Sequence, residues 1–190
     1  MIRQNQIFTI SNALTLIRML LVFPVWISLS NFYDEKFRIL TFILCLVAAL
    51  TDYLDGYIAR KRNEITEIGK IIDPIADKIL IAVLAIKLYE IGELSGYFLL
   101  IIVLRDVIIV IAAFLISLKL KKILPSNLLG KITTTVIGFV FLAVITGLNK
   151  QSIIFIFIYY GSILLIYASL LAYIIRAIEF LRKNRLNEFV

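Results

Sequence analysis

Residues 37–60 read FRILTFILCLVAALTDYLDGYIAR, an apolar stretch that ends in two aspartates and an arginine. Its length is sufficient for a bilayer, which a helix of about 20 apolar residues can cross. Acidic side chains are costly inside lipid, so they mark a functional site by default. This segment therefore predicts a membrane-spanning helix that carries chemistry at one of its ends.

The composition of the whole chain agrees with that interpretation. Of its 190 residues 62% are hydrophobic and 17% are charged, whereas soluble domains are about 45–50% apolar and about 25% charged. We expect six spanning helices, at about residues 12–31, 37–60, 70–90, 96–118, 128–148 and 152–176. The opening MIRQNQIFTI is expected to lie on the membrane surface as a short interfacial segment. Residues 1–190 contain no linker or repeat, so we expect one all-α membrane domain.

Basic residues predict the orientation and limit the function. They concentrate around the loop at 61–69, in the connection after 118 and beyond the last span, so both termini and the loop at 61–69 should face the cytoplasm of a multi-pass cell-membrane protein. The net charge of +7 is spread thinly, which suits anionic lipid or an acidic substrate rather than nucleic acid. Zero histidines and one cysteine exclude a Ser-His-Asp triad, a His-ligated zinc and an intrachain disulfide.

Four aspartates cluster where the second and third spans meet the cytoplasm. Asp52 and Asp55 are three residues apart and Asp73 and Asp77 are four apart, so each pair shares a helix face. In an antiparallel hairpin the four carboxylates would converge, and their mutual repulsion would require compensation. Carboxylates without histidine or cysteine favour Mg²⁺ or Mn²⁺. Two such ions suit displacement at phosphorus.

Neighbouring residues favour a ligand site over a structural contact. Gly56 and Gly69 allow close approach to the backbone, and Arg60 lies two turns from Asp52, where it can meet an anionic group. A single intramembrane aspartate is often a helix–helix contact, but that interpretation does not explain four of them. A cation transporter is a second alternative. It leaves these glycines and Arg60 unexplained, and it often contains inverted repeats, which are not evident here.

The motif Asp52-x2-Asp55-Gly56-x2-Ala59-Arg60-x8-Gly69-x3-Asp73-x3-Asp77 resembles the signature of the CDP-alcohol phosphotransferases. The opening Asn12-x2-Thr15-x2-Arg18, followed by Pro24, extends the resemblance into the first span. The resemblance implies a six-span homodimer that transfers a phosphatidyl group from CDP-diacylglycerol to an alcohol and releases CMP. It implies two divalent cations, Mg²⁺ or Mn²⁺, held by Asp52, Asp55, Asp73 and Asp77, with Asp77 as general base. It also implies that CDP-diacylglycerol contacts Asn12, Thr15, Asp52, Gly56, Ala59, Arg60 and Gly69.

The stretch GKIIDPIADKIL, residues 69–80, is similar to family members that use sn-glycerol 3-phosphate and to CDP-dependent cardiolipin synthases. We therefore expect synthesis of phosphatidylglycerophosphate for anionic phospholipid, with cardiolipin synthesis as the alternative. Arg105 and Lys131 resemble positions that surround the acceptor phosphate, and Lys78 could either contact it or compensate the acidic cluster. Arg105 has a second interpretation as the partner of Asp106, which stands where many glycerophosphate enzymes have glutamate.

Overall fold

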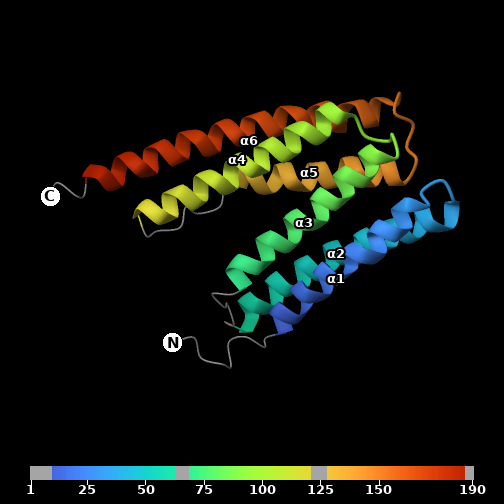
Figure 1. The fold of residues 1–190 in the computed structure, drawn as a ribbon, viewed down its shortest axis with the longest axis horizontal. Helices are drawn as coiled ribbons and strands as arrows, with labels where there is room; N and C mark the ends of the chain where they lie inside the picture. The colour runs from blue at the N-terminus through green and yellow to red at the C-terminus, as the bar shows by residue number, and fades with distance from the viewer. Residues whose placement is uncertain (1–9, 63–68, 121–127, 187–190) are drawn as a thin grey trace. The chain divides into compact units, whose positions relative to one another are not determined.

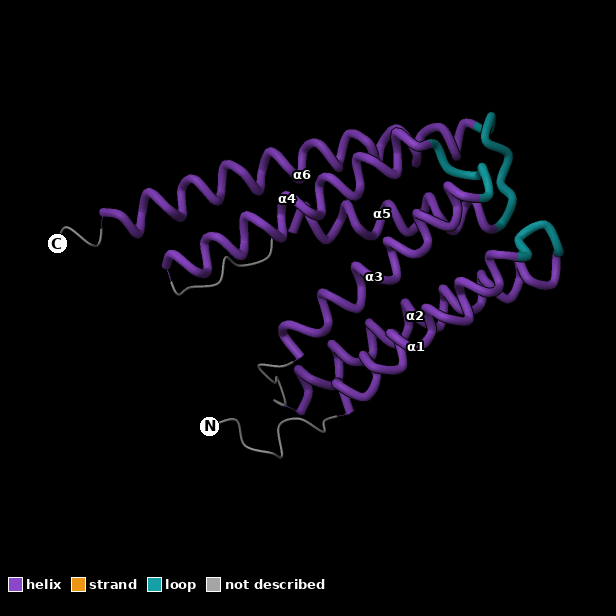
Figure 2. Tube along the Cα trace, viewed as in Figure 1, coloured by secondary structure: helices purple, strands orange, loops and turns teal. Residues whose placement is uncertain are grey.

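In a computed structural model, the described part of the chain forms six helices. The structure describes the backbone of residues 10–62, 69–120 and 128–186, and the side chains of residues 13–54, 76, 78–113, 116 and 128–182. The helices are α1 (Ile10–Ser30), α2 (Glu35–Arg62), α3 (Gly69–Glu90), α4 (Gly96–Leu120), α5 (Leu128–Ile145) and α6 (Ile153–Leu186), as Figures 1 and 2 show. The described residues include no strand, so the predicted all-α class is confirmed. The interfacial segment predicted at residues 1–10 lies almost entirely outside the described residues.

Five of these helices, α1, α2, α4, α5 and α6, are long and apolar enough to cross a membrane. Among the described residues α3 is not one of these helices, and its first half, GKIIDPIADKIL, carries two lysines and two aspartates. Spanning by residues 70–90 therefore stays a prediction. Many large side chains on the other helices, including Phe23, Val110 and Phe157, are exposed, and lipid is the solvent that such surfaces suit. The chain is thus an integral membrane protein.

The last helix is longer than the sequence predicted. Its apolar part was expected to end near residue 176, but α6 continues to Leu186. At 1.5 Å per residue, 34 residues extend for about 51 Å, against about 30 Å of hydrocarbon. The final stretch IEFLRKNRL is rich in leucine, arginine and lysine, which are good helix formers. The helix therefore continues beyond the point where hydropathy falls.

The chain divides into two compact units. Unit 1 comprises Met1–Leu94 with Val144–Gly147, and so contains α1, α2 and α3. Unit 2 comprises Ser95–Ala143 with Leu148–Val190, and so contains α4, α6 and most of α5.

In unit 1, α1 packs against both α2 and α3. The buried hydroxyls of Ser28 on α1 and Thr41 on α2 are hydrogen-bonded at 2.7 Å, a type of contact that joins helices inside membranes. Against α3, the ammonium of Lys87 lies 4.3 Å from the ring centroid of Trp26, within the range of a cation–π interaction. These contacts join the C-terminal end of α1 to the N-terminal end of α2 and the C-terminal end of α3.

In unit 2, α4 packs along α6. Near the N-terminal ends of both helices, Phe98 stacks on Tyr159 with ring centroids 4.8 Å apart. The Tyr159 hydroxyl is hydrogen-bonded to Ser95 at 2.8 Å. Farther along, Ile116 of α4 packs in one apolar cluster with Tyr173 of α6. The two helices are therefore held together along most of their length.

Two glycines set the ends of α3 and α5. Gly92 and Gly147 have φ angles of 77° and 74°, a left-handed conformation that glycine adopts without steric cost. After Gly147, the amide of Leu148 donates to the carbonyl of Ala143 at 3.0 Å, which is the Schellman pattern of a helix C-terminus. These sharp turns fix where each following segment starts.

Candidate active site

The described part of the aspartate site is centred on an ion pair between α1 and α2. Arg18 Nη1 lies 3.1 Å from Asp52 Oδ1. The Arg18 side chain is 1% exposed and the Asp52 side chain 53% exposed. A buried guanidinium requires compensation by an acceptor or a negative charge, which Asp52 supplies. The ion pair joins the opening motif of the chain to the aspartate motif, a contact that the sequence analysis did not predict.

The direction of the helices places the second aspartate pair at the same end of unit 1. Figure 1 shows α1 and α3 running in the same direction, and Trp26 and Lys87 are in contact near their C-terminal ends. Moving back from Trp26 to Arg18 covers about 12 Å along α1, and moving back from Lys87 to Asp77 covers about 15 Å along α3. The backbone of Asp77 therefore lies at about the level of the Arg18–Asp52 ion pair.

Most of the predicted site side chains lie outside those that the structure describes. They are Asn12, Asp55, Gly56, Ala59, Arg60, Gly69, Asp73 and Asp77, all of which lie in helices by their backbone. Thr15 is buried on α1, one turn from Arg18. Lys78 is half-buried on α3. The assignment of four metal ligands accordingly stays a prediction, since Asp52 is the only one of them with a described side chain.

The chemistry of Asp52 is compatible with a hard divalent cation. Its ion pair with Arg18 engages Oδ1, and the carboxylate is about half-exposed, so the group still presents oxygen to a ligand. Carboxylate oxygens are the donors that Mg²⁺ and Mn²⁺ prefer. The described residue thus fits the cation predicted for this end of unit 1.

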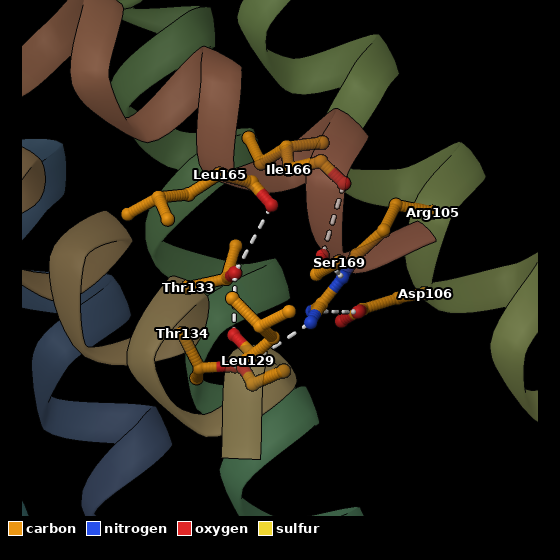
Figure 3. A network of polar contacts seen from close by, with 9 residues as sticks. Arg105, Asp106, Leu129, Thr133, Thr134, Leu165, Ile166 and Ser169 are labelled. Atoms are coloured by element: carbon orange, nitrogen blue, oxygen red, sulfur yellow. Dashed lines mark hydrogen bonds and ion pairs between the residues drawn. The ribbon is translucent and has the colours of Figure 1, made fainter. Parts of the chain in front are cut away.

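A second buried arginine, Arg105, is the centre of a hydrogen-bonded network in unit 2, shown in Figure 3. We call Arg105 and its three partners, Asp106, Gly130 and Ser169, the polar node. The Arg105 side chain on α4 donates from Nη1 to Asp106 Oδ1 at 2.7 Å, from Nε to Ser169 Oγ on α6 at 3.3 Å, and from Nη2 to the Gly130 carbonyl on α5 at 3.2 Å. One residue therefore links three helices. The pairing with Asp106 that the sequence suggested is present.

Around this node, α5 and α6 share a further contact. The Thr133 hydroxyl lies 2.7 Å from the Leu129 carbonyl and 3.2 Å from the Leu165 carbonyl (Figure 3). Lys131, the other cation predicted at the acceptor phosphate, is exposed near the start of α5, next to Gly130. Its contact with phosphate, like that of Arg105, stays a prediction.

Sequence reasoning missed Ser169 altogether. It lies in the apolar run LLIYASLLAYII of the last helix, where it is fully buried. A small polar residue inside such a run is a signal of contact between membrane helices, although that signal does not identify the partner.

Comparison with known proteins gives the class. A family model described as CDP-alcohol phosphatidyltransferase matches residues 8–176. The chain belongs to the CDP-alcohol phosphatidyltransferase family, as the aspartate motif predicted.

Individual relatives carry a more specific name, CDP-diacylglycerol–glycerol-3-phosphate 3-phosphatidyltransferase. The Rickettsia typhi protein of that name is 35% identical over 164 residues, covering 86% of this chain and 90% of the relative. The Wigglesworthia glossinidia brevipalpis protein is 30% identical over 168 residues, covering 87% and 89%. The Bacillus subtilis protein is 36% identical over 92 residues, covering 48% and 47%.

Proposed function

We propose that this protein transfers the phosphatidyl group of CDP-diacylglycerol to sn-glycerol 3-phosphate, forming phosphatidylglycerophosphate and CMP. The observation that carries the proposal is similarity at 30–35% identity, over 86–87% of the chain, to relatives named for this reaction. A match of that extent includes both the aspartate motif and the region from Arg105 to Lys131. The proposal therefore has a basis at both of the predicted substrate sites.

The reaction is a displacement at phosphorus. An acceptor hydroxyl oxygen attacks the phosphatidyl phosphorus, the phosphorus–oxygen bond to CMP breaks, and Asp77 accepts the hydroxyl proton as general base. Asp52, Asp55, Asp73 and Asp77 would hold two divalent cations, Mg²⁺ or Mn²⁺. When bound, these ions supply Lewis acidity at the pyrophosphate and stabilise the leaving group.

The donor is bound at the aspartate end of unit 1. Asn12, Thr15, Gly56, Ala59, Arg60 and Gly69 lie along the CDP moiety, together with Asp52. The Arg18 guanidinium, 3.1 Å from Asp52, offsets part of the repulsion among the carboxylates. It also holds the Asp52 carboxylate in one orientation, which lowers the entropy cost of forming the site.

The acceptor phosphate is bound by Arg105 and Lys131, with Lys78 as a further cation. A glycerol phosphate dianion has to be matched by positive charge where water is scarce. Arginine offers a planar fork for two phosphate oxygens and lysine a mobile point charge. Arg105 is 5% exposed, so its attraction for phosphate is weakly screened by water.

The membrane location and orientation of the enzyme are inferred from the distribution of its basic residues. Basic residues on one set of connections favour a cell-membrane protein with both termini and the active site on the cytoplasmic side. Membrane lipid is its solvent and the source of its donor. We also propose that it is a homodimer, as the family resemblance implies.

Acceptor competition tests this function. Purified protein is supplied with CDP-diacylglycerol, Mg²⁺ and equal amounts of glycerol 3-phosphate, phosphatidylglycerol and serine, and the lipid products are identified by mass spectrometry. We expect phosphatidylglycerophosphate with an equivalent of CMP. Cardiolipin as the main product would instead identify a cardiolipin synthase. No CMP release with any acceptor would contradict the proposed function.

Variants at the acceptor phosphate sharpen that test. Arg105→Ala and Lys131→Ala should raise the KM for glycerol 3-phosphate by about 30- to 1,000-fold, because each loses a charged hydrogen bond. The KM for CDP-diacylglycerol should stay nearly unchanged. A glycerol 3-phosphate KM that neither substitution moves would contradict the acceptor assignment and leave family membership intact.

A further inference from the structure

The buried serine on α6 is oriented by its own helix before it meets Arg105. Ser169 is 1% exposed, and its hydroxyl donates to the Ile166 carbonyl at 2.9 Å. With its single hydrogen used in that bond, the Ser169 oxygen can only accept. It accepts from Arg105 Nε at 3.3 Å, so the α6 backbone determines the direction from which Arg105 is held.

Each guanidinium nitrogen of Arg105 has a different acceptor. Ser169 Oγ meets Nε, Asp106 Oδ1 meets Nη1 and the Gly130 carbonyl meets Nη2. A guanidinium has five N–H bonds, and these contacts use three of them. Within the described part of the chain, one N–H on each terminal nitrogen therefore has no hydrogen-bond acceptor. The group is held on three sides and still has two donors to offer.

Charge compensation alone does not require this arrangement. The 2.7 Å contact between Arg105 and Asp106 already neutralises the guanidinium, and Ser169 adds no charge. What Ser169 adds is a fixed rotation of the guanidinium plane. Bidentate recognition of phosphate depends on that orientation, because the two N–H bonds must point at two oxygens together.

We propose that Ser169 is a positioning residue for the acceptor phosphate. Together with Asp106 and the Gly130 carbonyl, it orients Arg105 so that the two remaining N–H bonds meet the phosphate of the acceptor. This inference rests on the proposed function, in which Arg105 binds that phosphate. It assigns a role in substrate specificity to a side chain that does not touch the substrate.

The test compares the kinetics of Ser169 variants. Ser169→Ala should raise the KM for glycerol 3-phosphate about tenfold, the lower end of the range for a hydrogen bond to a charged group. The kcat and the KM for CDP-diacylglycerol should stay within about twofold of wild type, because the reacting groups are unchanged. A purely structural role would instead lower the melting temperature or the kcat and leave the glycerol 3-phosphate KM unmoved.

Two further Ser169 variants separate the hydroxyl from the shape of the side chain. Threonine and valine are nearly the same size, but only threonine keeps the hydroxyl. Ser169→Thr should retain a KM for glycerol 3-phosphate close to wild type, and Ser169→Val should match Ser169→Ala. Equal KM values for the threonine and valine variants would overturn the proposal, even if the alanine variant is too unstable to assay.

Ser162 provides the matched control on the same helix. It is buried two turns earlier, and its hydroxyl donates to the Tyr159 carbonyl at 2.6 Å. Ser162→Ala therefore removes the same kind of backbone hydrogen bond at a distance from Arg105. Its glycerol 3-phosphate KM should equal that of wild type, and a rise as large as that of Ser169→Ala would overturn the positioning role.

Arg105→Ala separates failure of the Ser169 positioning role from failure of the proposed phosphate-binding role of Arg105. If it raises the glycerol 3-phosphate KM while Ser169→Ala behaves like Ser162→Ala, the positioning role is wrong and the proposed function stands. If Arg105→Ala leaves that KM unchanged, the assignment of Arg105 to the phosphate fails first, and the role of Ser169 fails with it.

Discussion

The Arg18–Asp52 ion pair predicts unequal effects on stability when its two members are neutralised separately. Asp52→Asn removes the negative charge that lies 3.1 Å from the Arg18 guanidinium, which is 1% exposed and so has little access to water in its place. Arg18→Gln leaves the Asp52 carboxylate, which is 53% exposed and can be hydrated. We therefore expect Asp52→Asn to lower the free energy of unfolding more than Arg18→Gln does.

The magnitude follows from the burial of the pair. Exposed ion pairs contribute about 0.2–1 kcal/mol, whereas removing one partner of a fully buried pair costs about 3–5 kcal/mol. One member is buried here and the other is half-exposed, so an intermediate coupling energy of about 2 kcal/mol is expected. The double variant should then be more stable than the sum of the single losses indicates.

Trp26 provides the assay. It is the single tryptophan of the chain and lies on α1 against Lys87 of α3, so its fluorescence reports on the packing of unit 1. Unfolding by a denaturing detergent is followed for wild type, both single variants and the double variant. Chelator is present throughout, because any bound cation would stabilise the folded state by mass action.

The ion pair between Lys87 and Glu90, at the C-terminal end of α3, serves as the control. Lys87 and Glu90 are 2.9 Å apart, and the Glu90 side chain is 46% exposed. Glu90→Gln should cost no more than about 0.5 kcal/mol. If the Asp52 and Arg18 losses add within about 0.5 kcal/mol, the residues are not coupled, and the ion pair is not a stabilising feature of the site.

Two further predictions concern catalysis. Excess chelator should abolish CMP release and weaken CDP-diacylglycerol binding, with both restored by Mg²⁺ or Mn²⁺; full turnover in chelator would exclude the proposed cations. Asp77→Asn should bind CDP-diacylglycerol within about tenfold of wild type while kcat falls by about 10²–10⁴, the scale of general-base loss. Binding that collapses together with the rate would make Asp77 chiefly a metal ligand.

The helices could be predicted because lipid imposes a simple rule on sequence. Each spanning helix must be apolar for about 20 residues, so four of the six predicted segments end within two residues of the observed helices. The ends of α5 and α6 were less predictable. Hydropathy does not report the glycine turn after α5 or the polar continuation of α6.

Contacts between helices could not be predicted from the sequence, for a different reason. Spacing within one helix shows which residues share a face, as with Asp52 and Asp55. It does not show which face of another helix lies opposite, and Arg105 and Ser169 are 64 residues apart in the chain. The motif therefore indicated the chemistry of the site, and the neighbours that orient it became visible only in the folded chain.

Two arginines that are buried among the described side chains, Arg18 and Arg105, meet the same physical requirement with different consequences. Each is paired with an aspartate, because a guanidinium removed from water needs compensation. With two divalent cations on the proposed carboxylates, the four negative charges are matched and Arg18 leaves the donor site cationic, suited to an anionic pyrophosphate. Without those cations the proposed site would repel its donor, and chelation is therefore expected to weaken binding as well as turnover. At the proposed acceptor site Arg105 is already paired with Asp106, so we expect glycerol 3-phosphate recognition to depend on the orientation of the guanidinium, the property that we propose Ser169 supplies.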